Sequence, residues 1–417
     1  MTDFAGLGLA DPLLRAISDE GYSTPTPIQA GSIPALLDGH DLLGVAQTGT
    51  GKTASFALPL LHHLAQENRK AVSKKPRVLI LAPTRELAGQ IGESIRSYGR
   101  HLHLRTAVVF GGTSIRPQIQ AMNRGAHILI ATPGRLMDLM KQNQVQLDAV
   151  EVFVLDEADR MLDMGFIPDV RRITAALPKK RQTVLFSATM PKSIQGLADS
   201  LLRDPVHVEV TPAATTAERI DQQVLFVDKD KKRALMEDIL ADKSIERVLV
   251  FTRTKRSADR VAKFLGQSGI DAEAIHGNKA QNARQRALKN FRSGRIRALV
   301  ATDIAARGID VDGVTHVINF ELPDDPESYV HRIGRTARAG AEGIAITLCD
   351  MEQRSILRDI EKIIRQSVPV IDDHPYHSQE IADASGKSKK KTPQRNRRPA
   401  ASRRRGQQSR RPVKQAA

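Results

Sequence analysis

A run of eight residues, 46–53, restricts the fold of this chain more than any other part of the sequence. Its letters are Ala-Gln-Thr-Gly-Thr-Gly-Lys-Thr, and it lies between the apolar run 42–45 and a helical pattern that begins at Thr53. The apolar run predicts a short buried strand. Gly49 and Gly51 allow the backbone to curl so that its N–H groups and the helix N-terminus face phosphate oxygens. The order of strand, loop and helix therefore predicts a phosphate-binding loop.

Two side chains at the end of this run indicate which ligand it binds. Lys52 adds a positive charge and Thr53 supplies a hydroxyl for Mg²⁺, which together match the Gly-Lys-Thr ending of a Walker A motif. The first position departs from that motif, because Ala46 replaces its glycine. A Gly/Thr-rich turn with a solvated lysine is the structural alternative. We expect nucleotide binding, because strand, loop and helix all occur where the mechanism needs them.

Short apolar runs separated by helical patterns continue after this loop and predict a parallel sheet covered on both faces. The expected strands are 78–82, 107–110, 128–131, 152–155 and 184–186. Ligands of such sheets bind at the carboxyl ends of the strands. Polar motifs follow three of these strands, namely Pro83–Ala88, Gly111–Gly112 and Thr132–Arg135. Each alone is typical of a capped strand-to-helix turn, but three at one edge indicate a second ligand beside the nucleotide.

An acidic motif, Asp156–Asp159, follows the strand 152–155. A carboxylate at the end of a buried strand is where a Walker B aspartate holds Mg²⁺ on the phosphates, and we assign this role to Asp156. Glu157 is placed to orient or deprotonate an attacking water. Acidic residues also cap helices, but capping explains one carboxylate and not the whole cluster. Ser187–Thr189 follows the next strand and is a candidate relay between the nucleotide and the second ligand.

A second α/β unit follows a stretch of small and polar residues at 211–217, which we interpret as a linker. Its expected strands are 248–251, 272–275, 298–301, 316–320 and 344–348. This unit has no Gly-Lys-Thr of its own, so it can act only by completing the site of the first unit. Its candidates lie at 331–340, where Arg335 and Arg338 share a face and can reach one triphosphate.

Charge is unevenly distributed along the 417 residues, a length that allows two or three domains. Residues 386–417 hold thirteen Lys and Arg and no acidic residue, which leaves +3 of the net charge of +16 for the rest. With almost nothing apolar to bury, the segment 373–417 predicts a disordered tail. We expect this tail to bind nucleic-acid phosphates non-specifically, and a targeting or merely solvating role is the alternative.

Features of secreted and membrane proteins are missing from the sequence. The single cysteine, Cys349, cannot form an internal disulfide, no apolar run reaches membrane-spanning length, and the first residues lack the basic start of a signal peptide. We therefore expect a cytoplasmic protein. Tryptophan is absent and aromatic residues make up 4%, which argues against a surface that binds bases by aromatic stacking.

The segment Gly21–Gln29, near the N-terminus, contains two prolines that fix a rigid turn before a helix. They hold Gln29 in a set direction, and its amide offers the donor and the acceptor that an adenine edge requires. Without the other motifs, such a segment is more typical of plain architecture.

These motifs together resemble a DEAD-box RNA helicase. The likeness rests on the order and spacing of Gly21–Gln29, Ala46–Thr53, Pro83–Ala88, Thr132–Arg135, Asp156–Asp159 and Ser187–Thr189. It covers residues 4–370, and the basic tail is similar to bacterial RhlE-like members. The resemblance implies an α/β fold of two tandem RecA-like parallel-sheet domains with a disordered basic C-terminal tail. Its expected parts are the ATP-binding domain at 1–210 with a Q motif at 2–30, the linker at 211–217, the C-terminal domain at 218–372 and the tail at 373–417.

The resemblance also implies a role for each motif residue, with ATP and Mg²⁺ as cofactors. Catalysis would involve Lys52, Asp156, Glu157, Arg335 and Arg338, with Thr53 and Asp156 at the metal. Nucleotide contacts would come from Phe4, Tyr22, Gln29, Gln47, Thr48, Gly49, Thr50, Gly51, Lys52, Thr53 and Asp310. RNA contacts, mainly to the backbone, would come from Pro83, Thr84, Arg85, Gly112, Thr132, Gly134, Arg135, Thr252, Arg253, Gln281, Arg284 and Thr302. Coupling between the sites would involve Ser187, Thr189 and His331. Ala337 replaces a glycine that is common in the family.

We therefore expect an enzyme that hydrolyses ATP to ADP and phosphate on binding RNA, and that unwinds short duplexes locally or remodels RNA–protein complexes. Its two lobes would be apart when empty and close around ATP·Mg²⁺ and one RNA strand. Two alternatives stay open: an RNA chaperone whose tail anneals strands without ATP, and a related ATPase that acts on DNA, since no residue directly detects a 2′-hydroxyl. Partners in ribosome assembly or mRNA decay are both compatible with the family.

Overall fold

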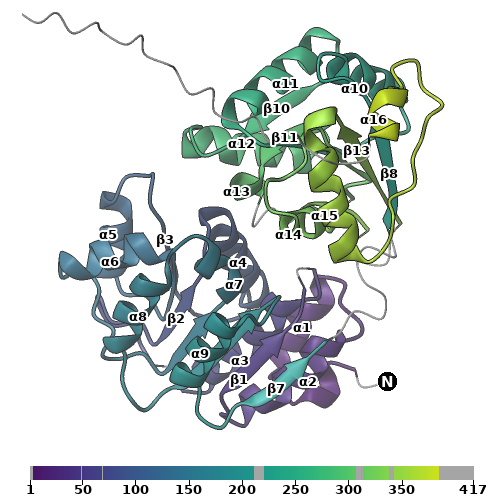
Figure 1. The fold of residues 1–417 in the computed structure, drawn as a ribbon. Helices are drawn as coiled ribbons and strands as arrows, with labels where there is room; N and C mark the ends of the chain where they lie inside the picture. The colour runs from purple at the N-terminus through teal and green to yellow at the C-terminus, as the bar shows by residue number, and fades with distance from the viewer. Residues whose placement is uncertain are drawn as a thin grey trace, which may run out of the picture.

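The computed structural model describes residues 3–384, apart from positions 48, 68, 211–219, 307–310, 312 and 338–341. Some sequence-based expectations lie outside the described residues, namely those on Thr48, Asp310, Arg338, the linker at 211–217 and the part of the tail after Ala384. The described residues form two α/β domains (Figure 1).

The first domain contains a seven-stranded sheet in the order β3-β4-β2-β5-β6-β1-β7, and all neighbouring strands pair in parallel. Its strands are β1 (Leu42–Val45), β2 (Val78–Leu81), β3 (Thr106–Val109), β4 (Ile128–Ala131), β5 (Val152–Leu155), β6 (Gln182–Ser187) and β7 (Val206–Glu209). Successive side chains point to opposite faces, and both faces are covered, so the central strands are apolar throughout. In β2, for example, Val78 and Ile80 belong to one core, whereas Leu79 and Leu81 belong to the other.

Helices cover both faces of this sheet. One face packs against α1 (Asp11–Asp19), α2 (Pro27–Leu37), α3 (Lys52–Glu67) and α4 (Arg85–Tyr98), which follow the short helix η1 (Ala5–Leu7). The other face packs against α5 (Arg116–Asn123), α6 (Pro133–Lys141), α7 (Ala158–Asp163), α8 (Ile167–Ala175) and α9 (Lys192–Leu201).

The second domain repeats this plan with a six-stranded parallel sheet in the order β10-β11-β9-β12-β13-β8. Its strands are β8 (Ile220–Phe226), β9 (Val248–Thr252), β10 (Ala272–Ile275), β11 (Ala298–Thr302), β12 (His316–Asn319) and β13 (Gly343–Cys349). One face carries α10 (Lys232–Ala241) and α11 (Lys255–Gln267). The other carries α12 (Gln281–Arg292), α13 (Asp303–Ala306), α14 (Glu327–Ile333), α15 (Arg354–Ile364), which follows η2 (Met351–Gln353), and α16 (Gln379–Asp383). The expected fold of two parallel-sheet domains is confirmed.

The two edge strands β7 and β8 are absent from the sequence-based expectation. Side chains of β7 alternate between half-buried and exposed, because only one face of this edge strand packs on the core. In β8, the polar residues Asp221, Gln222 and Gln223 interrupt the apolar run. Neither segment therefore shows the continuous apolar pattern by which the central strands are recognised.

The tail does not start at residue 373 as expected, because residues 373–384 pack on the second domain. Val224 of β8 pairs with Val370, Val227 pairs with His377, and the backbone N–H of Ser378 donates to the Phe226 carbonyl at 3.0 Å. The following helix, α16, buries its only isoleucine, residue 381, in the core of this domain. We call residues 368–384 the β8 strap. The largely polar sequence of residues 372–380 hides the contact, because backbone pairing requires no apolar side chain.

Within the part of the chain that the structure describes, we find no helix with the length and apolar character needed to cross a membrane.

The β8 strap should stabilise the second domain. A chain truncated after residue 372 loses the burial of Ile381, which we expect to contribute about 2 kcal/mol, together with the pairing to β8. Its second domain should unfold roughly 5 °C lower than that of a chain truncated after residue 384. Thermal unfolding, with amide exchange in β8 as the local readout, tests this. Equal midpoints and equal exchange in the two truncated chains would contradict it.

Candidate functional site

The loop between β1 and α3 has the shape expected of a phosphate-binding loop. α3 begins at Lys52, one residue earlier than expected, and the buried Lys52 ammonium donates to the Ala46 carbonyl at 2.8 Å. Gly49 and Gly51 adopt φ angles of +87° and +90°, in the left-handed region where a side chain is strained. The Thr50 hydroxyl donates to the Gln47 carbonyl at 2.8 Å and helps to hold the turn. Contacts within the chain thus hold the described residues on both sides of position 48.

Gln29 is fastened to this loop through both ends of its amide. Its oxygen accepts from the Thr26 N–H at 2.9 Å, and its nitrogen donates to the Gly51 carbonyl at 3.2 Å. A Cβ on Gly51 would lie 2.4 Å from the Gln29 nitrogen, which is a second reason for glycine there. Both amide atoms were expected to contact adenine, but here they bond within the chain. Gln29 is also the third residue of α2 and forms a capping box with Thr26.

The two aromatic candidates for nucleotide contact differ in exposure. Phe4 is buried in the core of the first domain. Tyr22 is 42% exposed and packs against Tyr98 at the end of α4, with ring centroids 6.2 Å apart and hydroxyl oxygens 3.3 Å apart. Burial raises the pKa of the Tyr98 phenol well above its usual value, so its hydroxyl keeps its proton at neutral pH.

The acidic motif brings two buried carboxylates together after β5. Asp156 is 2% exposed, and its Oδ1 atom is buried without a hydrogen-bond partner. Burial, with a smaller contribution from the neighbouring Glu157 charge, raises the pKa of Asp156 to about 7, although the Lys52 and Arg160 cations oppose the shift. An unpaired buried oxygen costs free energy unless a cation or water meets it, so the site fits a divalent metal.

Glu157 is held by a partner that sequence reasoning missed. It precedes α7 with a left-handed φ of +54°, and Arg160 forms a buried ion pair with its carboxylate at 2.7 Å. The only signal in the sequence is the i,i+3 spacing of the two residues.

Asp159 ties the acidic motif to the end of β6. Its carboxylate accepts from the backbone N–H of Ala188 at 3.2 Å and from the N–H and hydroxyl of Thr189 at 3.0 and 3.2 Å. The Ser187 hydroxyl donates to the Thr189 carbonyl at 2.8 Å and accepts from the Asp159 N–H at 3.2 Å. Ser187 and Thr189 are therefore hydrogen-bonded to the acidic motif. Asp159, which makes these contacts, had no role of its own in the sequence-based expectation.

The polar motifs after β2, β3 and β4 meet, as their place at the carboxyl ends of neighbouring strands requires. Arg85 lies against Gly112, where an added Cβ would overlap its guanidinium, and Gly112 has a φ of +76°. Arg135 donates to the Thr113 carbonyl at 3.1 Å. The structural alternative also holds in part, because the Thr84 hydroxyl caps α4 at 3.2 Å from the Leu87 N–H.

The other residues of these motifs have different surroundings. Pro83 and Thr132 are buried, and Thr132 precedes α6 without a side-chain cap. Gly134 is exposed, with open space where a Cβ would lie.

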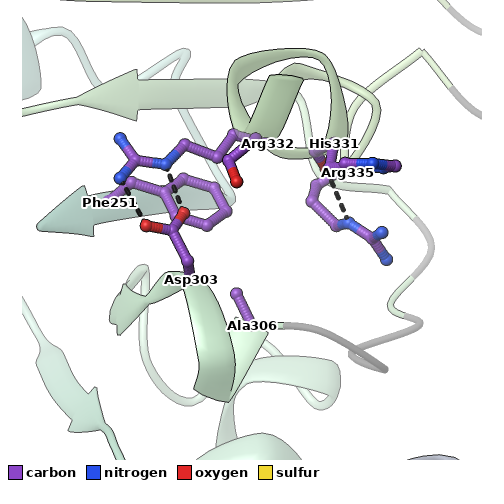
Figure 2. A pocket seen from close by; sticks show the side chains of 7 residues that line it. Phe251, Asp303, Ala306, His331, Arg332 and Arg335 are labelled. Atoms are coloured by element: carbon purple, nitrogen blue, oxygen red, sulfur yellow. Dashed lines mark hydrogen bonds and ion pairs between the residues drawn. The ribbon is translucent and has the colours of Figure 1, made fainter. Parts of the chain in front are cut away.

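Arg332 organises the strand ends of the second domain and was not predicted. It is 1% exposed, forms ion pairs with Asp303 at 2.5 and 2.8 Å, and its guanidinium carbon lies 5.0 Å from the centroid of the Phe251 ring (Figure 2). Figure 2 shows the Arg335 guanidinium pointing away from Asp303, with its Nε bonded to the His331 carbonyl at 3.1 Å. These residues line a pocket between β9, α13 and α14.

Other predicted residues of the second domain lie at the same edge of its sheet. Thr252 and Thr302 are buried, paired in register at the ends of β9 and β11. The Arg253 side chain bonds to Asp324 at 3.0 Å. Ala337 adopts a left-handed φ of +53°, which explains why glycine suits that position.

Gln281 and Arg284 connect the two domains. Arg284 forms an ion pair with Glu86 of α4 at 2.9 Å, and the Gln281 amide nitrogen donates to the same carboxylate at 3.1 Å. Arg85 donates to the Gln281 oxygen at 3.2 Å. Both residues therefore lie at the contact between the domains, and Glu86 is a further partner that was not predicted.

Comparison with known proteins gives matches over both domains. Residues 26–197 match the DEAD/DEAH box helicase family, and residues 230–340 match the helicase conserved C-terminal domain. The "DEAD-box ATP-dependent RNA helicase CshA" of Bacillus cereus is 44% identical over 378 residues, covering 89% of this chain and 71% of that protein. The protein of that name from Bacillus subtilis is 42% identical over 383 residues, covering 91% and 76%.

Solved structures also match along most of the chain. Dbp5 of S. cerevisiae bound to RNA and ADP BeF3 is 30% identical, with a TM-score of 0.77 over 89% of this chain and 96% of that one. Mss116p bound to ssRNA and AMP-PNP is 29% identical, with a TM-score of 0.80 over 91% and 81%. A DEAD box protein from Methanococcus jannaschii is 39% identical but has a TM-score of 0.53 over 89% and 99%.

The raised pKa of Asp156 predicts that the free energy of unfolding depends on pH. The folded chain holds the Asp156 proton more tightly than the unfolded chain, so stability falls as the pH rises from about 4 to about 7. Without metal or nucleotide, Asp156→Asn should gain roughly 1–3 kcal/mol over the native chain on going from pH 5 to pH 8. Denaturant unfolding in chelator measures this, and an equal difference at both pH values would contradict it.

Proposed function

The chain belongs to the DEAD-box family of ATP-dependent RNA helicases, and from this premise we propose how its residues divide the work of ATP hydrolysis and RNA unwinding. The observation that carries the proposal is the contact between the two domains at Glu86, Gln281 and Arg284. Gln281 and Arg284 are expected to bind RNA, and they lie at the interface that forms when the domains close. ATP hydrolysis on RNA binding, followed by local opening of short duplexes or remodelling of RNA–protein complexes, is the resulting activity.

ATP binds to the first domain. Lys52, Thr53 and the loop residues Gln47, Thr48, Gly49, Thr50 and Gly51 hold its phosphates, and Phe4, Tyr22 and Gln29 form the adenine side. The contact between Gln29 and Gly51 supports a link between base recognition and the shape of the phosphate loop. Asp310 of the second domain completes the nucleotide pocket on closure.

Mg²⁺ is the metal that this donor set fits, with Asp156 and Thr53 as its protein ligands. Hard oxygen donors and a buried, unpaired carboxylate oxygen support this assignment. When bound, the ion neutralises charge on the phosphate oxygens. Asp156 must then be ionised, which the Lys52 and Arg160 cations favour.

Hydrolysis uses Glu157 to orient the attacking water and accept its proton. The buried ion pair with Arg160 supports this role, because it fixes the orientation of the carboxylate. Arg335 and Arg338 of the second domain stabilise charge on the γ-phosphate, and such arginines contribute about 10³ to 10⁵ in rate in related phosphoryl transfers. The position of Arg335 beside the pocket between β9, α13 and α14, with its guanidinium pointing away from Asp303 (Figure 2), supports its part.

RNA binds across the strand ends of both domains, mainly through its backbone. The first domain contributes Pro83, Thr84, Arg85, Gly112, Thr132, Gly134 and Arg135, and the second contributes Thr252, Arg253, Gln281, Arg284 and Thr302. The convergence of Arg85, Gly112 and Arg135 supports one continuous surface.

Coupling between ATP and RNA runs through Ser187, Thr189 and His331. The bonds between Asp159 and Thr189 support a direct link from the acidic motif to the end of β6. The RNA-bound structures of Dbp5 and Mss116p match this chain across both domains, which supports a closed arrangement of the lobes here.

The finer identity of the protein is also a proposal. Its basic tail supports a likeness to RhlE-type members, whereas the relatives compared above are named CshA. We propose a cytoplasmic protein whose domains span 1–210 and 218–384, with a tail from 385 that adds affinity for RNA phosphates. Ribonucleoprotein or degradation complexes are the partners that fit this activity.

ATP turnover of the purified chain tests the proposal. We would measure it without nucleic acid, with single-stranded RNA and with DNA of the same sequence, at one fixed salt concentration. RNA should stimulate turnover strongly and DNA should not, and Lys52→Ala should abolish the stimulated rate. Equal rates in all three conditions would exclude coupling between RNA and hydrolysis.

Replacing Glu157 by glutamine tests its role directly. The isosteric Glu157→Gln change removes the proton acceptor, so turnover should fall by roughly 10² or more while ATP and RNA binding persist. Binding of a fluorescent ATP analogue and of labelled RNA serves as the control. Undiminished turnover in a folded variant would show that another group activates the water.

A further inference from the structure

The loop after β3 is held by a side chain that no motif includes. We call residues 110–114 the GG loop, after Gly111 and Gly112. Gln118 of α5 is 9% exposed, and its oxygen accepts from the Phe110 N–H at 3.2 Å. Its nitrogen lies within hydrogen-bond distance of the Phe110 carbonyl at 3.1 Å, the Thr113 hydroxyl at 3.0 Å and the Ser114 carbonyl at 3.2 Å. One amide therefore bridges the start and the end of the loop.

The opposite side of the GG loop meets the residues proposed to bind RNA. Arg135 donates to the Thr113 carbonyl, and Arg85 lies where a side chain on Gly112 would be. A loop that bends through a left-handed glycine has many alternative conformations when nothing fixes it. A ligand that requires one conformation loses affinity in proportion to the time the loop spends in the others.

We propose that Gln118 is a positioning residue for RNA: it holds the GG loop in the conformation that receives the RNA backbone. It acts through the loop, because it is buried and bonded to loop atoms. This inference rests on the proposed function, since it assumes that RNA lies against Gly112 and Arg85. It adds a determinant of RNA affinity that lies outside the residues assigned to RNA contact.

Gln118→Met tests the proposal, because methionine has a similar length and removes all four polar contacts. Gln120, exposed on the same helix, provides the matched control Gln120→Met. The readouts are the affinity for labelled single-stranded RNA with a non-hydrolysable ATP analogue, the RNA concentration that half-saturates ATP turnover, the KM for ATP, the unfolding midpoint and amide exchange of residues 110–114.

Gln118→Met should raise the half-saturating RNA concentration and the RNA dissociation constant roughly tenfold. The loop conformation loses the net stabilisation of about one to two hydrogen bonds. Amide exchange should quicken in the GG loop. The rate at saturating RNA, the KM for ATP and the unfolding midpoint should stay near their native values, as should every readout of Gln120→Met. Thr113→Val removes one of the same contacts in a second way and should raise both RNA values roughly threefold.

Native RNA affinity in folded Gln118→Met, together with faster exchange in the loop, would overturn the proposal. A parallel loss of RNA affinity, ATP affinity and midpoint would also overturn it, because that pattern indicates general destabilisation. If Gln118→Met does not fold, native RNA affinity in Thr113→Val overturns the proposal. Gly112→Val separates this inference from the proposed function: if RNA stimulates the native chain and Gly112→Val weakens RNA binding but Gln118→Met does not, only the role of Gln118 fails.

Discussion

Parallel pairing obliges all strands of a sheet to end at the same edge, and the rest of this structure depends on that constraint. In the first domain, Thr84, Thr132 and Asp156 follow neighbouring strands and Ser187 ends the next one, so they lie at one edge although they are far apart in sequence. The second domain repeats the arrangement with Thr252 and Thr302 in register. A change in the register of one strand would move its side chains to the wrong face and displace its motif as well.

The sequence predicted well those features that depend on local pattern. The central strands were recognisable because both of their faces are buried, and the turn between β1 and α3 because a Gly-Thr-Gly-Lys-Thr run follows an apolar strand and opens a helix. Contacts between distant residues left no such pattern. Nothing local indicates that Arg284 meets Glu86 or that Gln29 reaches the carbonyl of Gly51. From the sequence, Gln118 would be expected on the exposed face of a helix, and only the structure shows that it is buried.

Several buried charges lie at the candidate sites of the two domains. Lys52, Asp156, Glu157 and Arg160 lie within one site, and Arg332 with Asp303 repeats the theme in the other domain. Removing such groups from water costs several kcal/mol each, so a buried pair is weak evidence for stability. A fixed ion pair does, however, limit the orientations of each partner. We interpret these pairs as a means of holding reactive groups in place before the ligand arrives.

The β8 strap has a consequence for the order of folding. β8 is the first strand of its domain to be synthesised, but among the described residues it pairs only with β13 and with the strap. Its partners therefore emerge more than a hundred residues later. Until then β8 is an unpaired strand with apolar side chains, the kind of segment that associates with other chains. For this domain, completion of the sheet is a late event, and the nascent chain depends on it to bury its first strand.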